Sequence, residues 1–117
     1  MLNVTNNVQI YLCTSPTDMR RSFDGLSSLV ASVMNKDPLS GHLFLFLNRR
    51  RDRIKLLYWD NDGLAIWMKR LEAGTFETPR ASADQSCLEL DVTQLTLLLT
   101  GVSLESVKRR KRYSLTA

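Results

Sequence analysis

The sequence predicts a single α+β domain built on a mainly antiparallel sheet of four to six strands. Three observations lead to this fold class. Apolar runs of strand length follow one another between residues 42 and 70, separated only by short polar turns. Apolar residues at helical spacing precede these strands, and a second, shorter helical pattern follows near residue 95. With 117 residues, of which 44% are hydrophobic, the chain can bury one ordinary core.

The first expected elements are a short strand at residues 8–13 and a long amphipathic helix at residues 16–34. Ser15 is expected to cap this helix, with Pro16 at its first position and Asp18 in its first turn. Apolar residues recur at helical spacing, so the helix should pack one face against the sheet. These residues are Met19, Phe23, Leu26, Val30 and Val33.

An antiparallel meander of three strands is expected next, at residues 42–47, 54–59 and 64–70. Its second turn, at residues 60–63, contains the Asp, Asn and Gly that tight turns favour. Its first turn, at residues 48–53, is crowded with arginine. The planar fork of arginine N–H groups matches phosphate oxygens, so this turn predicts a phosphate-bearing partner.

The faces of the meander depend on its register, because side chains alternate along a strand. Two registers are open, and either sets Lys55 opposite Lys69 or Arg70. One register also brings Trp59 and Trp67 onto this basic face, an arrangement that suits nucleic acid. The alternative is that both tryptophans belong to the core and the cations only make an outer face soluble.

The C-terminal part is expected to complete the sheet and add a shorter helix. A short strand at residues 75–78, ended by Pro79, is one open possibility. Residues 80–86 are expected to form a polar loop, and residues 87–90 have the composition of a last strand. Asp91 and Gln94 then form a capping-box pattern. The helix that they start carries Leu95, Leu98 and Leu99 on one side, and Gly101 suits its end.

A second basic cluster lies near the end of the chain. The expected organisation is one domain at residues 1–107, followed by a basic tail at residues 108–117. The rival interpretation is a helix-turn-helix whose second helix, at residues 103–112, is basic. The tail interpretation is favoured because the second helix would have only a thin apolar face. The cations of this cluster are Lys108, Arg109, Arg110, Lys111 and Arg112.

Composition narrows the function classes. A net charge of +4 favours acidic partners. Cys13 and Cys87 are too few and too far apart for a disulfide framework, so we expect free thiols in a reducing compartment. We expect a cytoplasmic protein that does not contact a membrane, since the N-terminus lacks a secretory pattern and no apolar run approaches the roughly 20 residues that span a bilayer.

Catalytic and metal-binding patterns are missing from the sequence. Five aspartates could hold metal ions for phosphoryl transfer, as nuclease carboxylates do, but four of them fit helix capping, turn chemistry or neutralisation of neighbouring arginines. A lone His42 and the two distant cysteines show no ligand spacing, and no nucleophile or phosphate-loop motif occurs. We therefore expect no enzyme, no metal and no cofactor. The aspartates considered are Asp18, Asp24, Asp52, Asp60 and Asp62.

Five segments occur in an order that resembles a known family. They are residues 18–26, 37–44, 49–52, 55–60 with Gly63, and 67–76. The chain resembles, from about residue 8 to residue 101, the TnpB accessory proteins encoded by the second open reading frame of insertion-sequence-66 transposons. These are not the RNA-guided nucleases that share the name TnpB.

The resemblance implies a small protein that supports transposition while a separate, larger protein of the element cleaves DNA. Two departures from the family pattern stand out. The family has an aromatic residue before the proline that here follows Thr78, and residues 105–117 lie outside the pattern.

Two functions are expected from these observations. The leading one is a non-catalytic accessory protein of transposition that contacts DNA through the arginine-rich turn and neighbouring cations. The alternative is an adaptor that binds the transposase or another protein of the element without touching DNA. The residues expected to bind nucleic acid are Arg49, Arg50, Arg51, Arg53, Lys55, Lys69 and Arg70, together with the C-terminal cluster of Lys108, Arg109, Arg110, Lys111 and Arg112.

Overall fold

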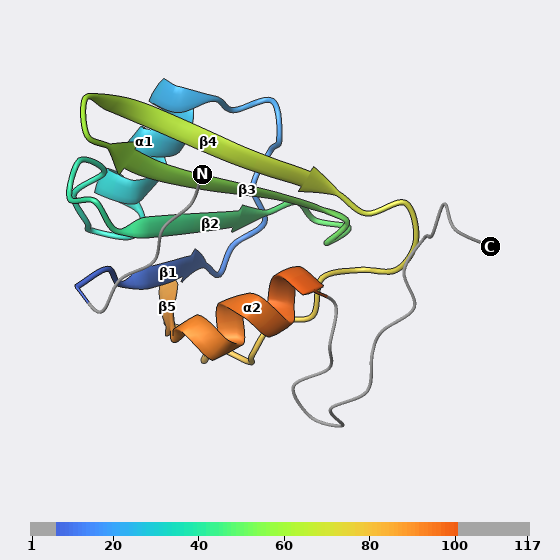
Figure 1. The fold of residues 1–117 in the computed structure, drawn as a ribbon. Coiled ribbons are helices and arrows are strands. Elements are labelled where there is room, and N and C mark those ends of the chain that lie inside the picture. Colours follow the sequence, from blue (N-terminus) through green and yellow to red (C-terminus); the bar gives the residue numbers. More distant parts are fainter. Residues whose placement is uncertain (1–6, 101–117) are drawn as a thin grey trace.

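The computed structural model describes residues 7–100, which form one five-stranded sheet with a helix on each face (Figure 1). Residues 1–6 and 101–117 lie outside the described part, and with them the predicted tail and the predicted second helix. The elements in chain order are β1 (Ile10–Cys13), α1 (Phe23–Ser32), β2 (Leu43–Leu47), β3 (Arg53–Asp60), β4 (Gly63–Arg70), β5 (Cys87–Leu90) and α2 (Val92–Thr100).

The strand order is β4-β3-β2-β1-β5, so β4 and β5 form the two edges of the sheet. The α+β class and the number of strands agree with the prediction, but the sheet is mixed. β1 and β2 are parallel, while the other three neighbouring pairs are antiparallel. The physical reason is the connection between β1 and β2, which passes through α1. A crossover that contains a helix returns the chain in its original direction, whereas a hairpin reverses it.

The first helix is much shorter than predicted, because it begins at Phe23 and not at Pro16. Local and long-range hydrogen bonds hold the preceding residues in another conformation. The N–H of Thr17 donates to the carbonyl of Leu47 over 2.8 Å, and the N–H of Arg20 donates to the Asp18 carboxylate over 2.9 Å. An Asp side chain that bonds a nearby backbone N–H competes with helix formation in this way.

Two layers of core follow from the alternation of side chains in the strands. Leu26 and Val30 of α1 pack on one face of the sheet, where Phe44 is fully buried. Leu95 and Leu98 of α2 pack on the other face. All five residues of β2 are buried as a result, as expected for a strand covered on both sides.

The C-terminal elements agree closely with the prediction. The N–H of Gln94 donates to Asp91 Oδ1 over 2.7 Å, and the N–H of Asp91 donates to Gln94 Oε1 over 2.9 Å, which is the predicted capping box. Residues 87–90 form the edge strand β5. Residues 75–78 form no strand; Phe76 is instead buried in the core. No helix within residues 7–100 is long and apolar enough to cross a bilayer.

Candidate nucleic-acid interface

The arginine turn, defined as residues 48–53, connects β2 to β3 and is organised by the side chain of Asn48. Asn48 Oδ1 accepts hydrogen bonds from the N–H groups of Asp52 and Arg53, each over 3.1 Å. Asn48 Nδ2 donates to Asp52 Oδ1 over 2.6 Å. The side-chain amide of Asn48 thus makes the hydrogen bonds that hold the turn together, and the arginine side chains take no part in them.

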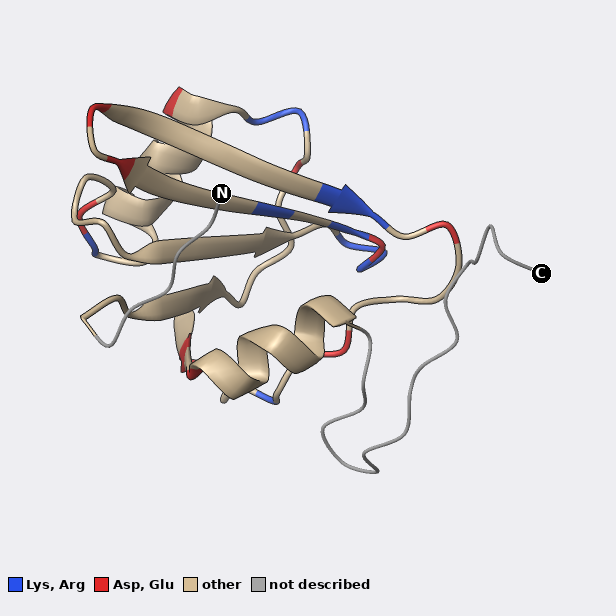
Figure 2. Cartoon of the chain, in the orientation of Figure 1, with Lys and Arg blue, Asp and Glu red and all other residues tan. Residues whose placement is uncertain are grey.

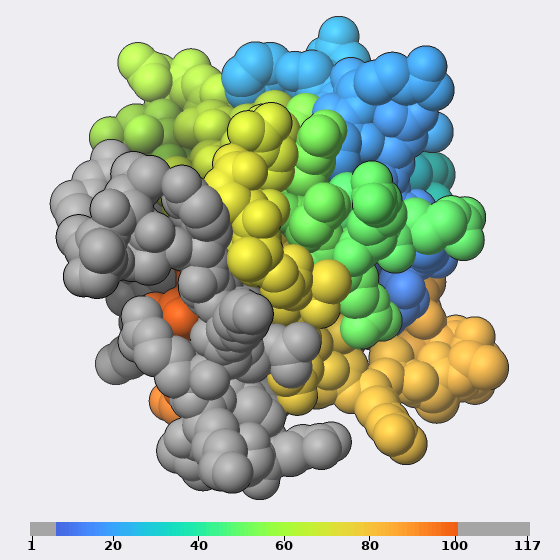
Figure 3. Space-filling view, turned by 90° about the vertical axis from the view of Figure 1, so that its right-hand side faces the viewer, coloured from blue at the N-terminus to red at the C-terminus, as the bar shows by residue number. Residues whose placement is uncertain are grey.

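A second set of bonds ties the turn to the chain that follows β4. The carbonyl of Arg51 accepts the N–H of Phe76, and the carbonyl of Asp52 accepts the N–H of Leu71, both over 2.7 Å. Leu71 and Phe76 are buried in the core, so the turn rests on packed side chains. Figure 3 shows the green turn standing out from the surface beside the yellow segment that follows β4.

The arginines of this turn point into solvent. Arg49, Arg50, Arg51 and Arg53 are all exposed, and none forms an ion pair with another residue in the described range 7–100. Within the turn, the hydrogen bond from Asn48 lowers the pKa of Asp52, and the charges of Arg50 and Arg53 lower it further. Asp52 therefore stays ionised and offsets part of the positive charge, while its oxygen is used to hold Asn48.

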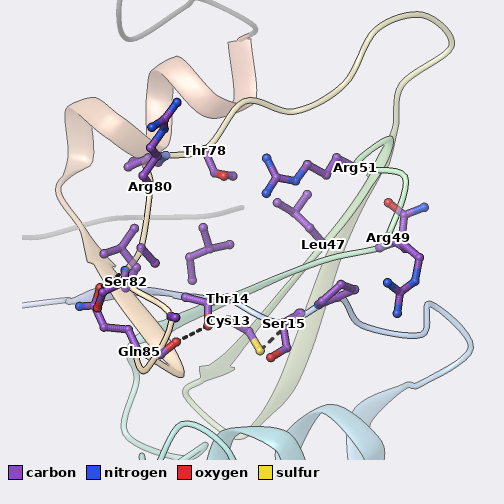
Figure 4. A pocket seen from close by; sticks show the side chains of 17 residues that line it. Cys13, Thr14, Ser15, Leu47, Arg49, Arg51, Thr78, Arg80, Ser82 and Gln85 are labelled. Carbon is purple, nitrogen blue, oxygen red and sulfur yellow. Dashed lines mark hydrogen bonds between the residues drawn. The ribbon is translucent and has the colours of Figure 1, made fainter.

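Two clefts flank the arginine turn. The larger one, about 520 Å³, lies between the turn, the end of β1 and the loop after Pro79, and none of the described residues that line it is acidic. Its cations are Arg49, Arg51 and Arg80, and Figure 4 shows Arg51 reaching from the turn toward Thr78. The smaller cleft, about 450 Å³, is lined by Arg49, Arg50 and Arg53 on the other side of the turn.

Asp18 is the one acidic residue within the described range 7–100 that lines the smaller cleft, and it is already paired with Arg20. Arg20 Nη2 lies 2.6 Å from Asp18 Oδ2, and this contact lowers the pKa of Asp18 to about 2. The exposed positive charge around both clefts is therefore largely free to meet an anion.

Arg80 is a further candidate that the sequence does not single out, because a single arginine in a polar loop forms no recognisable pattern. Its loop is tied to the end of β1 by Thr14. The hydroxyl of Thr14 donates to the carbonyl of Gln85 over 2.6 Å, and the N–H of Thr14 donates to the carbonyl of Ser86 over 3.2 Å. These long-range bonds, together with the bond from Phe76 to Arg51, hold the segment that carries Arg80 beside the cleft that the arginine turn borders.

Lys55 lies in the interior and not on a basic surface. It is 8% exposed, and its Nζ donates to the carbonyls of Met19 and Arg21 over 2.8 and 2.7 Å. The predicted register is also wrong, since Lys55 faces Met68 across the strand pair. The turn that pairs Asp60 with Gly63 sets this register. It is a two-residue loop, which fixes the register of a hairpin.

The other predicted cations of the meander have partners within the chain. Lys69 Nζ donates to the carbonyl of Leu99 over 3.1 Å, at the C-terminal end of α2, and Arg70 pairs with Glu72 over 3.0 Å. Trp59 pairs with Leu64, and Trp67 pairs with Leu56. The two tryptophans therefore lie on opposite faces of the sheet, and the predicted aromatic and basic face does not form. The predicted cations at residues 108–112 lie outside the described residues.

The described charges separate along the sheet. Figure 2 shows Lys and Arg gathered where β3 begins and β4 ends, while the turn between these strands carries Asp at the opposite end. Residues 7–100 contain no group of three or more His, Cys, Asp or Glu side chains that could hold a metal ion. These features define a small α+β domain with a cationic end.

The chain belongs to the family described as IS66 Orf2 like protein, whose model matches residues 8–109. This agrees with the resemblance seen in the sequence and identifies a transposition-associated accessory protein. Two proteins of Sinorhizobium fredii (strain NBRC 101917 / NGR234) are similar to it. "Uncharacterized protein y4jC" is 34% identical over 110 residues, covering 94% of this chain and 92% of the relative. "Uncharacterized protein y4hO" is 35% identical over 102 residues, covering 87% of each chain. No solved structure matches the chain.

Proposed function

We propose that this protein is a non-catalytic accessory protein of transposition that contacts DNA through the arginine turn. The observation that carries the proposal is the combination of exposed arginines with a backbone held in one conformation. Arg49, Arg50, Arg51 and Arg53 have no carboxylate partner among the described residues. Because Asn48 and the Phe76 N–H already hold the turn, binding a phosphate needs little further ordering of the backbone.

The chemistry of the site favours the phosphate backbone of DNA over its bases. The side chains that line the two clefts are rich in guanidinium, hydroxyl and amide groups, which are the usual partners of phosphate oxygens. Contacts of this kind position a protein on DNA without reading its sequence, and they weaken steeply as salt rises. We therefore propose that the turn anchors the protein on DNA, with Arg80 contributing from the far wall of the larger cleft.

The carboxylates support the non-catalytic part of the proposal. Phosphoryl transfer by two metal ions needs several carboxylates converging on one place. Here Asp18 is paired with Arg20, Asp52 is bonded to Asn48, and Asp60 lies at the opposite end of β3 from the arginine turn. Each carboxylate thus has a separate place in the fold.

A titration of labelled DNA with the purified full chain, followed by fluorescence anisotropy at several salt concentrations, tests the proposal. The Arg49→Ala/Arg50→Ala variant should bind more weakly at every DNA sequence. The slope of log K against log salt should fall by about 0.9 for each phosphate that the variant no longer neutralises. Arg21→Ala/Lys36→Ala is the matched control, since it also removes two exposed cations but neither of them lines the two clefts.

Equal affinity and equal salt slope for the arginine variant and the wild type would refute DNA contact through the turn. Absence of DNA binding by the wild type at low salt would favour the adaptor function. One observation favours that alternative: Trp67 and Met68 are both exposed on the edge strand β4, and aromatic residues and methionine are enriched in protein interfaces.

Truncation after Val107 separates the arginine turn from the C-terminal basic cluster. If the turn is the main contact, removing residues 108–117 should weaken binding less than the arginine substitutions do, because the backbone of the turn is already held in place and needs little further ordering to bind. If residues 103–112 act as a recognition helix, truncation should instead abolish any sequence preference, while the arginine variant keeps it.

A further inference from the structure

β4 is an edge strand without the usual protection against pairing. It is eight residues long, and its only neighbour in the sheet of residues 7–100 is β3. Edge strands are normally kept apart by shortness, charge, proline or a bulge. β4 has no charge and no proline between Gly63 and Met68, and Trp67 and Met68 are 37% and 51% exposed. The opposite edge, β5, has only four residues and an exposed Glu89.

The outer side of β4 offers a row of backbone groups to a partner. β3 pairs with all eight residues of β4, and these pairs occupy the backbone groups on one side of β4. Within the described range, no other segment forms a backbone hydrogen bond to residues 63–70. Figure 1 shows β4 as the outermost strand of the sheet. A further strand could therefore join the sheet here by main-chain bonding, as in β-strand addition.

The charges along β4 favour a particular partner. Asp60 and Asp62 lie in the turn just before β4, while Lys69 and Arg70 are the last two residues of β4. A parallel copy would bring like charges together, which destabilises a strand pair. An antiparallel copy brings the acidic end of each strand to the basic end of the other. The edge is therefore complementary to itself.

We propose that two copies of this protein associate through antiparallel pairing of their β4 edges, around a two-fold axis at Ile66. A two-fold axis between neighbouring antiparallel strands is perpendicular to the sheet, so each face stays on its own side. Ile66 lies on the α1 face of the sheet, because it pairs with Leu57, which is buried in the core beneath α1. Leu64 and Met68 lie on the same face, since side chains alternate along a strand. Leu64 then faces the partner's Met68, and Asp62 faces the partner's Arg70.

This pairing joins the two sheets into one and covers both exposed apolar side chains, since Trp67 faces the partner's Ala65. It also sets the positions of the arginine turns. Arg53 pairs with Arg70, so each arginine turn lies at the Arg70 end of its own β4. The antiparallel arrangement places one turn at each end of the joined sheet. The self-association does not depend on the proposed function, but with it the dimer would carry two DNA contacts.

Analytical ultracentrifugation of the full chain without DNA tests the association. The wild type should sediment as a dimer at micromolar concentrations, and Met68→Lys should shift it to monomer. Val92→Lys is the matched control, because Val92 is also 51% exposed but lies on α2. A wild type that stays monomeric throughout the micromolar range would overturn the proposal and leave the β4 edge available to a different protein.

A charge exchange tests the orientation. Asp62→Arg and Arg70→Asp should each weaken self-association, since each places like charges at both ends of the pair. When these two variants are mixed, every end again joins opposite charges, so a mixed dimer should form. Failure of the mixture to associate would overturn the antiparallel arrangement, and both variants should keep the circular dichroism of the wild type.

Cross-linking tests the register. Under mild oxidation, Ile66→Cys should give a disulfide-linked dimer, because the axis sets residue 66 opposite itself. Leu64→Cys should not, since its partner position is Met68. The reverse result would show another register and would overturn the axis at Ile66. Wild-type protein, which has its own Cys13 and Cys87, is the control for unrelated cross-links.

Discussion

The two turns at the ends of β3 are opposites in charge and in the way they are held. The arginine turn is basic and depends on the side chain of Asn48 and on backbone bonds from Leu71 and Phe76. The turn from Asp60 to Gly63 is acidic and local. It is closed by the N–H of Asp62 donating to the carbonyl of Asp60 over 2.6 Å, with Asn61 at a φ of 58°.

The acidic hairpin turn needs only its own residues, whereas the arginine turn, which presents several like charges, is supported by residues remote in sequence. Asn61 adopts the left-handed conformation that asparagine tolerates better than most residues. Arg51 has a similar φ of 59° without such a preference, and its carbonyl is fixed by Phe76. The core thus holds the arginine turn in a shape that its own sequence does not favour.

The largest expected effect comes from removing that support. Phe76→Ala should lower the free energy of unfolding by about 3–5 kcal/mol, because Phe76 is 1% exposed and its truncation leaves a cavity beneath the arginine turn. Urea denaturation measures the change. Leu39→Ala is the control for an exposed apolar residue, at 53% exposure, and should change stability by less than about 0.5 kcal/mol. A Phe76 effect as small as that of the control would show that the turn does not depend on the core.

A smaller effect is expected from the side chain that closes the turn. Asn48→Ala removes three hydrogen bonds and should cost about 1–2 kcal/mol, measured by the same denaturation. Asn61→Gly, in the acidic turn, should be neutral or slightly stabilising, because glycine adopts positive φ without strain. A larger loss of stability in Asn61→Gly than in Asn48→Ala would contradict this difference between the two turns.

Local features of the fold were predictable from the sequence, and long-range ones were not. The capping box of Asp91 and Gln94 and the strands on either side of the arginine turn depend on neighbouring residues. The start of α1 differs from the prediction because Thr17 bonds to Leu47, which is remote in sequence. The local pattern of Ser15, Pro16 and Asp18, which predicts a helix start, contains no information about a contact with Leu47.

The candidate site divides in the same way. The exposed arginines of the turn follow from their place between two apolar strands. Strand alternation predicts Lys55 on a basic surface, but Lys55 is buried, and the carbonyls of Met19 and Arg21 accept its hydrogen bonds. Arg80 joins the larger cleft only through tertiary contacts. The sequence can thus predict that arginines in a turn are exposed. It cannot predict which groups a lysine or arginine elsewhere in the chain will contact, because those contacts depend on the tertiary fold.

The smallest expected effect concerns the pH dependence of the arginine turn. The hydrogen bond from Asn48 is the main cause that lowers the pKa of Asp52, followed among the lowering causes by its own backbone N–H and the charges of Arg50 and Arg53. A carboxyl whose pKa is lower in the folded state stabilises the fold above its unfolded pKa, about 3.9 for Asp. That contribution is lost as the pH falls through the folded value. Asp52→Asn should therefore reduce the decline of stability on acidification below about pH 4.

Measuring the titration of the Asp52 carboxyl by NMR in the wild type and in Asn48→Ala sharpens this prediction. The wild-type pKa should lie below the ordinary value for aspartate, and Asn48→Ala should raise it, because the hydrogen bond that lowers it most is gone. Arg50→Ala should raise it less, since an exposed charge is screened by water and salt. If Arg50→Ala had the larger effect, the arginines would be what holds the charge of Asp52. The acidic side chain would then be a partner that competes with phosphate for the same arginines, and the turn would bind DNA more tightly in Asp52→Asn than in the wild type.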